Sequence, residues 1–163
     1  MEYLWSPWRM EYLLSNKENQ KCIFCSALDI ADDFDNRIVY RGDMAFVILN
    51  RYPYTSGHLM IVPFQHVSSL ELLDLETRIE IMELMTKSII VLREEYHPEG
   101  FNIGINIGEV SGAGVAEHVH IHIVPRWGGD TNFMSTLAGT RVLPETLDDT
   151  FGRIRCAWKD IAA

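Results

Sequence analysis

The chain has 163 residues, a hydrophobic content of 47% and a formal net charge of −9 at pH 7. This size predicts one domain over residues 1–163, and the negative charge argues against nonspecific binding to nucleic acids. No apolar run approaches the roughly 18 residues of a membrane span, and the start lacks the pattern of a signal peptide, so we expect a cytoplasmic protein without membrane contacts.

Short apolar runs bounded by turn residues predict a sheet. Residues 1–20 form an aromatic arm, which must pack either on the core of the chain or on a partner subunit. Pro125 and Arg126 are expected to end the last strand, because proline cannot donate to a ladder. Strands are predicted at residues 37–41, 44–50, 57–63, 101–108 and 118–127.

Two helices complete the pattern, at about residues 69–96 and at 144–161, with Pro144 near the start of the second. The first shows apolar residues at a spacing of three to four, opposite its charged residues: Leu75, Ile79, Met82, Thr86, Ile89 and Leu92. The connection at 109–117 is too short for a parallel crossover, so we predict an α+β fold with a mostly antiparallel five-stranded sheet, one long helix and a C-terminal helix.

Three of the six histidines stand at alternate positions in the stretch HVHIHIVPRW, residues 118–127. In a strand, His118, His120 and His122 would line one face, with neighbours roughly 7 Å apart. One metal ion binds histidine nitrogens at about 2 Å, so it could not easily hold all three. The row therefore predicts that one histidine does the chemistry and that its neighbours support it.

His120, the central member of the row, is the candidate nucleophile. If a backbone carbonyl holds its N–H, the other ring nitrogen is fixed for attack. Histidine forms covalent intermediates in group transfer, and attack on phosphorus would give a phosphoramidate that water or phosphate cleaves. His118 and His122 could stabilise the phosphate oxygens or protonate the leaving group.

Two features near the histidines could contact a nucleotide. The loop SGAGV at 111–115 can present the backbone N–H groups of Gly112, Gly114 and Val115 to an anion, or it can be a simple turn between strands. The flat face of Trp127 could stack on a nucleobase, or it could pack against the arm or a partner subunit.

The motif CIFC contains two of the three cysteines, Cys22 and Cys25, too few for a disulfide framework. A redox role is expected in a βαβ context, which is not predicted here. A structural zinc site needs two more ligands, and His66 and His118 are candidates. The alternative is a pair of reduced, buried thiols.

The stretch HVHIHIV is similar to the His-φ-His-φ-His-φ-φ signature, with φ apolar, of the histidine triad (HIT) superfamily of nucleotide hydrolases and transferases. The resemblance runs from Cys22 to about Met134 and includes GHLMIVP and the loop from Asn106 to Gly114. The aromatic arm and PRWGGDTNFM resemble the bacterial branch that contains diadenosine tetraphosphate phosphorylases. The stretch NRYP at 50–53 resembles the NRxP of Fhit-type dinucleoside polyphosphate hydrolases.

The resemblance implies roles for four histidines. His120 is the nucleophile that becomes nucleotidylated, His122 contacts the α-phosphate and His118 orients the triad. His58 matches a fourth family histidine near the active site.

The resemblance also implies binding roles. Asn50 matches a residue that contacts the ribose, and Asn106 matches one that contacts the bridging or leaving-group side. Relatives of this kind are homodimers whose sheets join across the interface. The ligands of zinc-bearing bacterial members match Cys22, Cys25, His66 and His118.

The chain departs from the family pattern before the triad. Gly114 and Val115 stand where many relatives have Gln-Ser or Gln-Thr, so backbone N–H groups must replace a side-chain contact to phosphate. The loop is one residue longer than in the phosphoramidase branch, which disfavours phosphoramidates as the main substrate.

Three functions can be weighed on these residues. The first is cleavage of a dinucleoside polyphosphate at the α-phosphorus through His120, with hydrolysis of adenosine phosphoramidates as the alternative in the same superfamily. The second is a metalloenzyme with zinc on the histidine row, which the row spacing argues against, so no catalytic metal is expected. The third is a nucleotide-binding or signalling module with little turnover, which the complete triad argues against.

Overall fold

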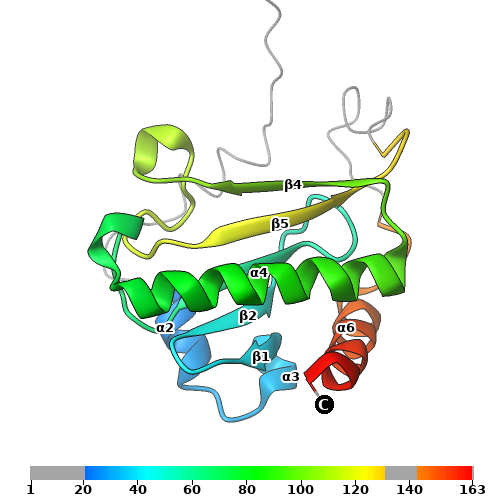
Figure 1. Ribbon diagram of the computed structural model, residues 1–163, viewed down its shortest axis with the longest axis horizontal. Helices are drawn as coiled ribbons and strands as arrows, with labels where there is room; N and C mark the ends of the chain where they lie inside the picture. Colours follow the sequence, from blue (N-terminus) through cyan, green and yellow to red (C-terminus); the bar gives the residue numbers. More distant parts are fainter. Residues whose placement is uncertain (1–20, 131–142, 163) are drawn as a thin grey trace, which may run out of the picture.

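The predicted sheet is present, with five antiparallel strands in the order β1-β2-β3-β5-β4 (Figure 1). The computed structural model describes residues 21–130 and 143–162. The strands are β1 (Ile38–Arg41), β2 (Ala45–Leu49), β3 (Leu59–Pro63), β4 (Gly100–Ile105) and β5 (Ile121–Arg126). The α+β prediction is confirmed, and β4 and β1 are the edge strands of the described sheet.

The two faces of the sheet bury separate apolar clusters. Helix α4 (Leu75–Tyr96) contacts β2, β3 and β5 on one face, and α6 (Leu147–Ala162) packs beside it on α4 and β1 (Figure 1). Ile121 and Ile123 of β5 belong to the cluster on this face. The opposite face packs Phe46 and Met60 against Phe24 of the short helix α2 (Ile23–Leu28).

The long helix begins later than predicted. Residues Leu70–Leu72 form a separate 3₁₀ turn, η1, and Leu73 is extended. Asp74 then starts α4 because its carboxylate accepts the backbone N–H of Thr77 at 2.7 Å, which satisfies one of the free N–H groups of the first turn. The start at about residue 69 is therefore wrong, while the end at Tyr96 is confirmed.

The apolar stripe predicted for this helix is largely on the wrong face. Leu75, Ile79 and Met82 are 58%, 55% and 55% exposed, and of the six predicted positions only Leu92 is fully buried. The helix is apolar on more than one side, so the spacing alone could not select the side that meets the sheet. The buried positions of α4 are Thr77, Ile81, Leu84, Ser88, Val91 and Leu92.

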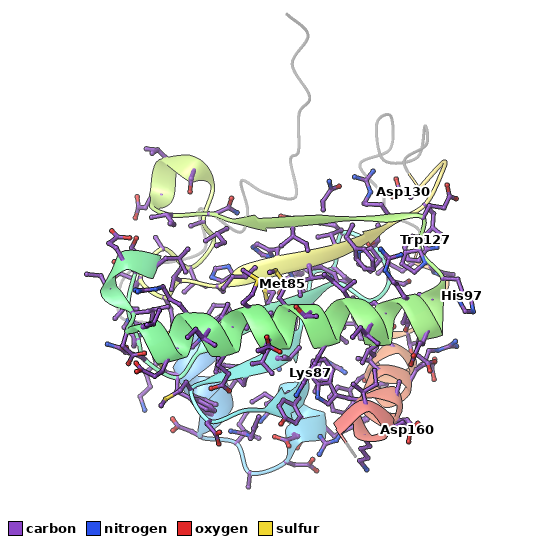
Figure 2. The ribbon with its side chains drawn as sticks, in the orientation of Figure 1. Met85, Lys87, His97, Trp127, Asp130 and Asp160 are labelled. Carbon is purple, nitrogen blue, oxygen red and sulfur yellow. The ribbon has the colours of Figure 1, made fainter. Side chains whose placement is uncertain are left out.

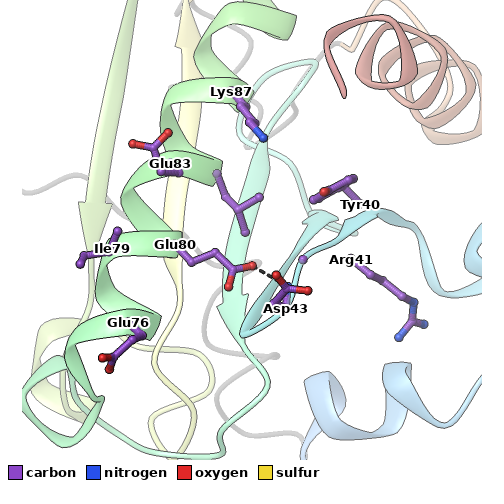
Figure 3. Close-up of a pocket in the computed structure, with 10 residues that line it drawn as sticks. Tyr40, Arg41, Asp43, Glu76, Ile79, Glu80, Glu83 and Lys87 are labelled. Atoms are coloured by element: carbon purple, nitrogen blue, oxygen red, sulfur yellow. Dashed lines mark hydrogen bonds between the residues drawn. The ribbon is translucent and has the colours of Figure 1, made fainter. Parts of the chain in front are cut away.

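The predicted hairpin of β1 and β2 is confirmed, and its turn is held by α4. The carboxylate of Glu80 accepts the backbone N–H groups of Asp43 and Met44, both at 2.7 Å, across the cleft shown in Figure 3. A Cβ atom on Gly42 would lie 1.9 Å from Oε1 of Glu80. Glycine is therefore required for this close approach of helix and turn.

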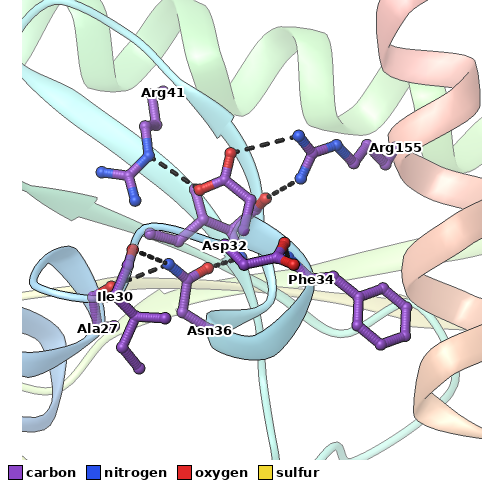
Figure 4. A network of polar contacts seen from close by, with 9 residues as sticks. Ala27, Ile30, Asp32, Phe34, Asn36, Arg41 and Arg155 are labelled. Carbon is purple, nitrogen blue, oxygen red and sulfur yellow. Dashed lines mark hydrogen bonds and ion pairs between the residues drawn. The ribbon is translucent and has the colours of Figure 1, made fainter.

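The C-terminal helix is tied to the start of the described chain. Arg155 of α6 and Arg41 of β1 both contact the carboxylate of Asp33, at 3.3 and 3.0 Å, in the short helix α3 (Asp33–Asn36) (Figure 4). The helix begins at Leu147, three residues later than predicted, after Thr146 accepts the backbone N–H of Asp149.

Some predictions concern other parts of the chain. The aromatic arm at 1–20 and residues 131–142 lie outside the described residues. Within 21–130 and 143–162, no helix combines the length and the apolar character that a membrane crossing requires.

Candidate active site

The histidine stretch enters the sheet later than predicted, because β5 begins at Ile121 rather than at His118. Continuing the pairing of β3 with β5 would set Pro63 opposite Val119. The described pairing ends before that point, with Ile61 opposite Ile121, and Pro63 has no N–H with which to extend it. Val119 instead donates its backbone N–H to the carbonyl of Val67 at 2.7 Å. The first two triad histidines therefore lie just before the strand.

The prediction that Pro125 and Arg126 end the strand is confirmed for Arg126, the last residue of β5, whereas Pro125 lies within the strand. β5 continues to Arg126 and pairs with β4 along its whole length, with Phe101 opposite Pro125. The pairing with β3 stops at Ile123, so the missing N–H of Pro125 removes no hydrogen bond to β3. The carbonyl of Pro125 still accepts the hydroxyl of Thr55 at 2.8 Å.

Backbone carbonyls fix the tautomers of the first two triad histidines. Nε2 of His118 lies 2.9 Å from the carbonyl of Pro63, and Nδ1 of His120 lies 2.9 Å from the carbonyl of His118. A carbonyl only accepts, so each of these nitrogens carries the proton. His118 then keeps a lone pair on Nδ1, and His120 keeps one on Nε2.

Both histidines are buried, with exposed fractions of 0% for His118 and 4% for His120. Burial lowers the pKa of both side chains, against the opposing effect of their hydrogen bonds to carbonyls. The neutral imidazole of His120 is therefore favoured at neutral pH, which is the form that a nucleophile needs.

The third triad histidine is paired with His58. The backbone N–H of Tyr54 donates to Nδ1 of His58 at 3.1 Å, so the proton of neutral His58 is on Nε2. That nitrogen lies 3.0 Å from Nδ1 of His122. Nδ1 of His122 is then the acceptor, and the proton of neutral His122 is on Nε2. The ring of His122 is 4.9 Å from that of His120, between centroids.

Asn50 joins the same cluster. Its Oδ1 accepts the backbone N–H of Tyr52 at 2.9 Å, which turns Nδ2 toward the ring of His58 at 3.4 Å. The sequence did not point to Tyr54, whose ring lies 4.8 Å from that of His58. No motif marks that aromatic residue, because its contact depends on how the turn before β3 folds.

The other residues predicted to contact the nucleotide lie in different surroundings: Asn106, Gly112, Gly114 and Val115. Continuing the register of β4 and β5 sets Asn106 opposite His120. The backbone N–H of Gly112 donates to the carbonyl of Glu109 at 2.9 Å, so it is used within the loop. Gly114 is exposed, and Val115 packs against the apolar cluster on the histidine face.

The strand β4 leaves space beside His122. Gly104 pairs directly with His122, and a Cβ atom on Gly104 would meet no other heavy atom within 4 Å. Directly paired residues of a sheet face the same side, so the histidine face is open at this position.

Trp127 lies apart from the triad histidines of its own chain. It is five residues beyond His122, roughly 16 Å along an extended chain. Its indole N–H donates to the carbonyl of Tyr96 at 3.3 Å, and Figure 2 shows it near His97 at the C-terminal end of α4.

The CIFC motif meets two histidines. One ligand atom from each of four side chains lies within 4.8 Å of the others, in Cys22, Cys25, His66 and His118. The distance from Sγ of Cys22 to Nδ1 of His118 is 3.3 Å, and that from Sγ of Cys25 to Nδ1 of His66 is also 3.3 Å.

These four side chains fit a tetrahedral metal. Ligands at about 2.0 to 2.3 Å from one ion lie roughly 3.3 to 3.8 Å apart, and the soft thiolate and imidazole donors suit zinc. The lone pair of His118 on Nδ1 points to the same cluster, while its Nε2–H is held by the carbonyl of Pro63. Burial raises the pKa of the Cys25 thiol.

The antiparallel sheet and the gathered imidazoles define the class of this protein, an α+β protein with a histidine-based site. The HIT domain matches residues 32–129. The chain therefore belongs to the HIT family, which is a family of enzymes.

Individual relatives agree with this assignment. A protein of Mycobacterium tuberculosis named AP-4-A phosphorylase is 39% identical over 97% of this chain and 85% of its own. A Bacillus subtilis protein named Protein hit is 31% identical over 70% of this chain and 77% of its own. The crystal structure of a Zn-bound histidine triad family protein from Mycobacterium smegmatis superposes with a TM-score of 0.69 and 26% identity, covering 87% of this chain and 96% of that one.

Proposed function

We propose that this enzyme cleaves dinucleoside polyphosphates at the α-phosphorus, with His120 as the nucleophile. The observation that carries the proposal is the hydrogen bond from Nδ1–H of His120 to the carbonyl of His118, because it leaves the lone pair on Nε2. The relative named AP-4-A phosphorylase supports diadenosine tetraphosphate as the substrate.

The proposed reaction has two steps. Nε2 of His120 attacks the α-phosphorus, the bond to the leaving polyphosphate breaks, and the polyphosphate leaves as an anion whose oxygen accepts a hydrogen bond from Nε2–H of His122. A phosphate ion or a water molecule then attacks the same phosphorus, and the P–N bond breaks to restore the lone pair on Nε2 of His120, with a proton released to solvent when water is the acceptor. With diadenosine tetraphosphate, the first step releases ATP, and the second releases ADP with phosphate or AMP with water.

Other predicted residues are proposed to bind the nucleotide. Asn106 and the backbone N–H groups of Gly114 and Val115 are candidates for the phosphate oxygens, and Asn50 for the ribose. Trp127 stays a candidate for stacking on a base, at a position remote from the attacked phosphorus.

We also propose that the four clustered side chains hold a structural zinc. The distances among them and the tautomer of His118 support this, as does the Zn-bound relative of known structure. Cys22, Cys25, His66 and His118 would be its ligands. Zinc would then anchor α2 to the start of the histidine stretch, and the chemistry at phosphorus would be done by the histidines alone.

A homodimer is proposed as the assembly, from the family resemblance and from the surface. Ile103 of the edge strand β4 is 43% exposed, and α4 carries three further exposed apolar residues, Leu75, Ile79 and Met82. Apolar groups of this size on a surface favour burial by a partner. The cytoplasmic location rests on the sequence and stays a proposal.

Product analysis with diadenosine tetraphosphate tests the proposed reaction. We expect ATP and ADP when phosphate is present, and the His120→Ala variant to bind nucleotide without turnover. ATP and AMP without phosphate would identify a hydrolase. If neither pair forms while an adenosine phosphoramidate is hydrolysed, the substrate is the alternative one, and the dinucleoside polyphosphate proposal is wrong.

A further inference from the structure

Phe24 connects the metal-binding motif to the proposed nucleophile. It stands between Cys22 and Cys25 and is 2% exposed. Its ring centroid lies 5.5 Å from that of His118, edge-on at 79°, and 4.9 Å from that of His120, tilted by 53°. One side chain of the CIFC motif therefore touches both a metal-ligand candidate and the nucleophile candidate.

A second contact runs through the backbone in the same direction. The carbonyl of His118 accepts Nδ1–H of His120 at 2.9 Å, while the ring of His118 faces Cys22 and Cys25. The position of His118 thus determines one hydrogen bond of His120, and Phe24 packs against one side of the His120 ring. Both positions depend on the CIFC segment.

We propose that Phe24 is a positioning residue for His120, by which the folded CIFC motif holds the imidazole with Nε2 directed at the substrate. The inference rests on the proposed function, since it concerns the nucleophile of that reaction. The ring of His120 is covalently bound at Cγ and hydrogen-bonded at Nδ1, and two rings stand 4.9 Å from it, those of Phe24 and His122. Phe24 limits the swing of the imidazole away from the carbonyl on its own side, because its buried ring fills that space.

Other residues of the same cluster do not share this role. Phe46 is fully buried in the cluster that contains Phe24, and its ring contacts that of Phe64, at 5.5 Å. Phe46→Leu is therefore a matched control for Phe24→Leu. Each replaces a buried phenyl ring by a smaller apolar side chain on the same face of the sheet, and only the change at Phe24 removes a described ring contact with the triad histidines.

The test compares the two variants in the full-length, zinc-loaded protein. Long-range ¹⁵N–¹H spectra of the histidine rings report the tautomer of His120 without any substrate. We expect a single Nδ1–H tautomer for the wild type and for the control Phe46→Leu, and a mixture of tautomers for Phe24→Leu. Zinc content should stay at the wild-type level in both variants.

Turnover of diadenosine tetraphosphate gives the second readout. Misplacing a reacting group by about 1 Å can cost on the order of 100-fold in rate, so we expect kcat of Phe24→Leu to fall by at least about tenfold, with KM changed by less than about twofold. Phe46→Leu should keep kcat within about threefold of the wild type.

Two results would overturn the inference. An unchanged His120 tautomer in zinc-loaded Phe24→Leu means that the phenyl ring only fills the core. A raised KM with unchanged kcat means that Phe24 contacts the substrate instead. If the wild type does not turn over diadenosine tetraphosphate, the proposed function fails, and the spectra of the two variants still decide the role of Phe24.

Discussion

At the scale of single residues, backbone groups decide what each histidine can do. The carbonyl of Pro63 accepts the ring N–H of His118, and the carbonyl of His118 accepts that of His120. The backbone N–H of Tyr54 donates to Nδ1 of His58, which leaves the proton of neutral His58 on Nε2. His120 therefore has a lone pair on Nε2, and the neighbouring His122 has a proton on Nε2. A nucleophile and a hydrogen-bond donor to the leaving oxygen need these two states.

The pairing of His58 with His122 gives a prediction for two substitutions. Glutamine at position 58 keeps an amide N–H₂ that can donate to Nδ1 of His122, whereas leucine removes the donor. We expect His58→Leu to lower kcat by about 100-fold, the lower end of the range for losing one donor that stabilises developing charge, and His58→Gln to lower it several-fold less. Steady-state kinetics with diadenosine tetraphosphate measure this. Equal losses in the two variants, at equal thermal stability, would contradict the assigned tautomers.

The sequence could predict part of this cluster. The alternation of the triad and the requirement for a carbonyl partner of His120 follow from local rules of strand and imidazole chemistry. The contact of His58 with His122 spans 64 positions, and that of Cys22 with His118 spans 96. Such pairs follow from the order of strands in the sheet, so the family resemblance suggested these residues and the local pattern could not. Phe24 and Tyr54 carry no motif that marks them.

At the scale of elements, the end of β3 and the start of β5 position the site. The pairing of β3 with β5 ends at Ile61 and Ile121, so the chain carrying His118 and His120 is held by side-chain and loop hydrogen bonds instead. The five strands could be predicted because short apolar runs between turn residues, and alternation in the histidine stretch, are local signals. The face of α4 could not, because its apolar residues lie on several sides and only the packed sheet selects among them.

The proposed zinc site, which would anchor the short helix α2, gives a prediction about metal removal. Purified protein should contain about one zinc per chain, because four ligands complete a tetrahedral site. Chelation should lower the melting temperature, because binding to the folded state alone stabilises it. Elemental analysis and thermal unfolding measure the two effects.

The chain offers a matched control for the metal site. Cys25→Ser should lose zinc, while Cys156→Ser, which changes an exposed cysteine of α6, should retain it. A metal-free preparation with the full melting temperature would refute a structural zinc.

At the scale of the whole molecule, one face of the sheet is covered by α4 and α6, and the sheet ends at β4 with an exposed Ile103. An edge strand with apolar side chains is a surface on which another strand can pair. The α+β class follows from the sequence pattern, but the assembly depends on surfaces that only the folded chain presents.

The edge strand gives the prediction for the assembly. Light scattering coupled to size exclusion should give twice the mass of the chain for the wild type and a lower mass for Ile103→Glu. Ile30→Glu is the control, since Ile30 is also exposed, at 39%, and lies outside the edge strand. A monomeric wild type, or a dimeric Ile103→Glu, would argue against joining of the sheets through β4.

Formation of a nucleotidyl-histidine on His120 is the central claim, and mass spectrometry of rapidly quenched protein tests it most directly. The enzyme is mixed with diadenosine tetraphosphate without phosphate, quenched and digested. We predict a mass gain of one adenylyl group on the peptide that contains His120, and no such gain in His120→Ala. An adenylyl group on another residue, or full turnover by His120→Ala, would contradict the account.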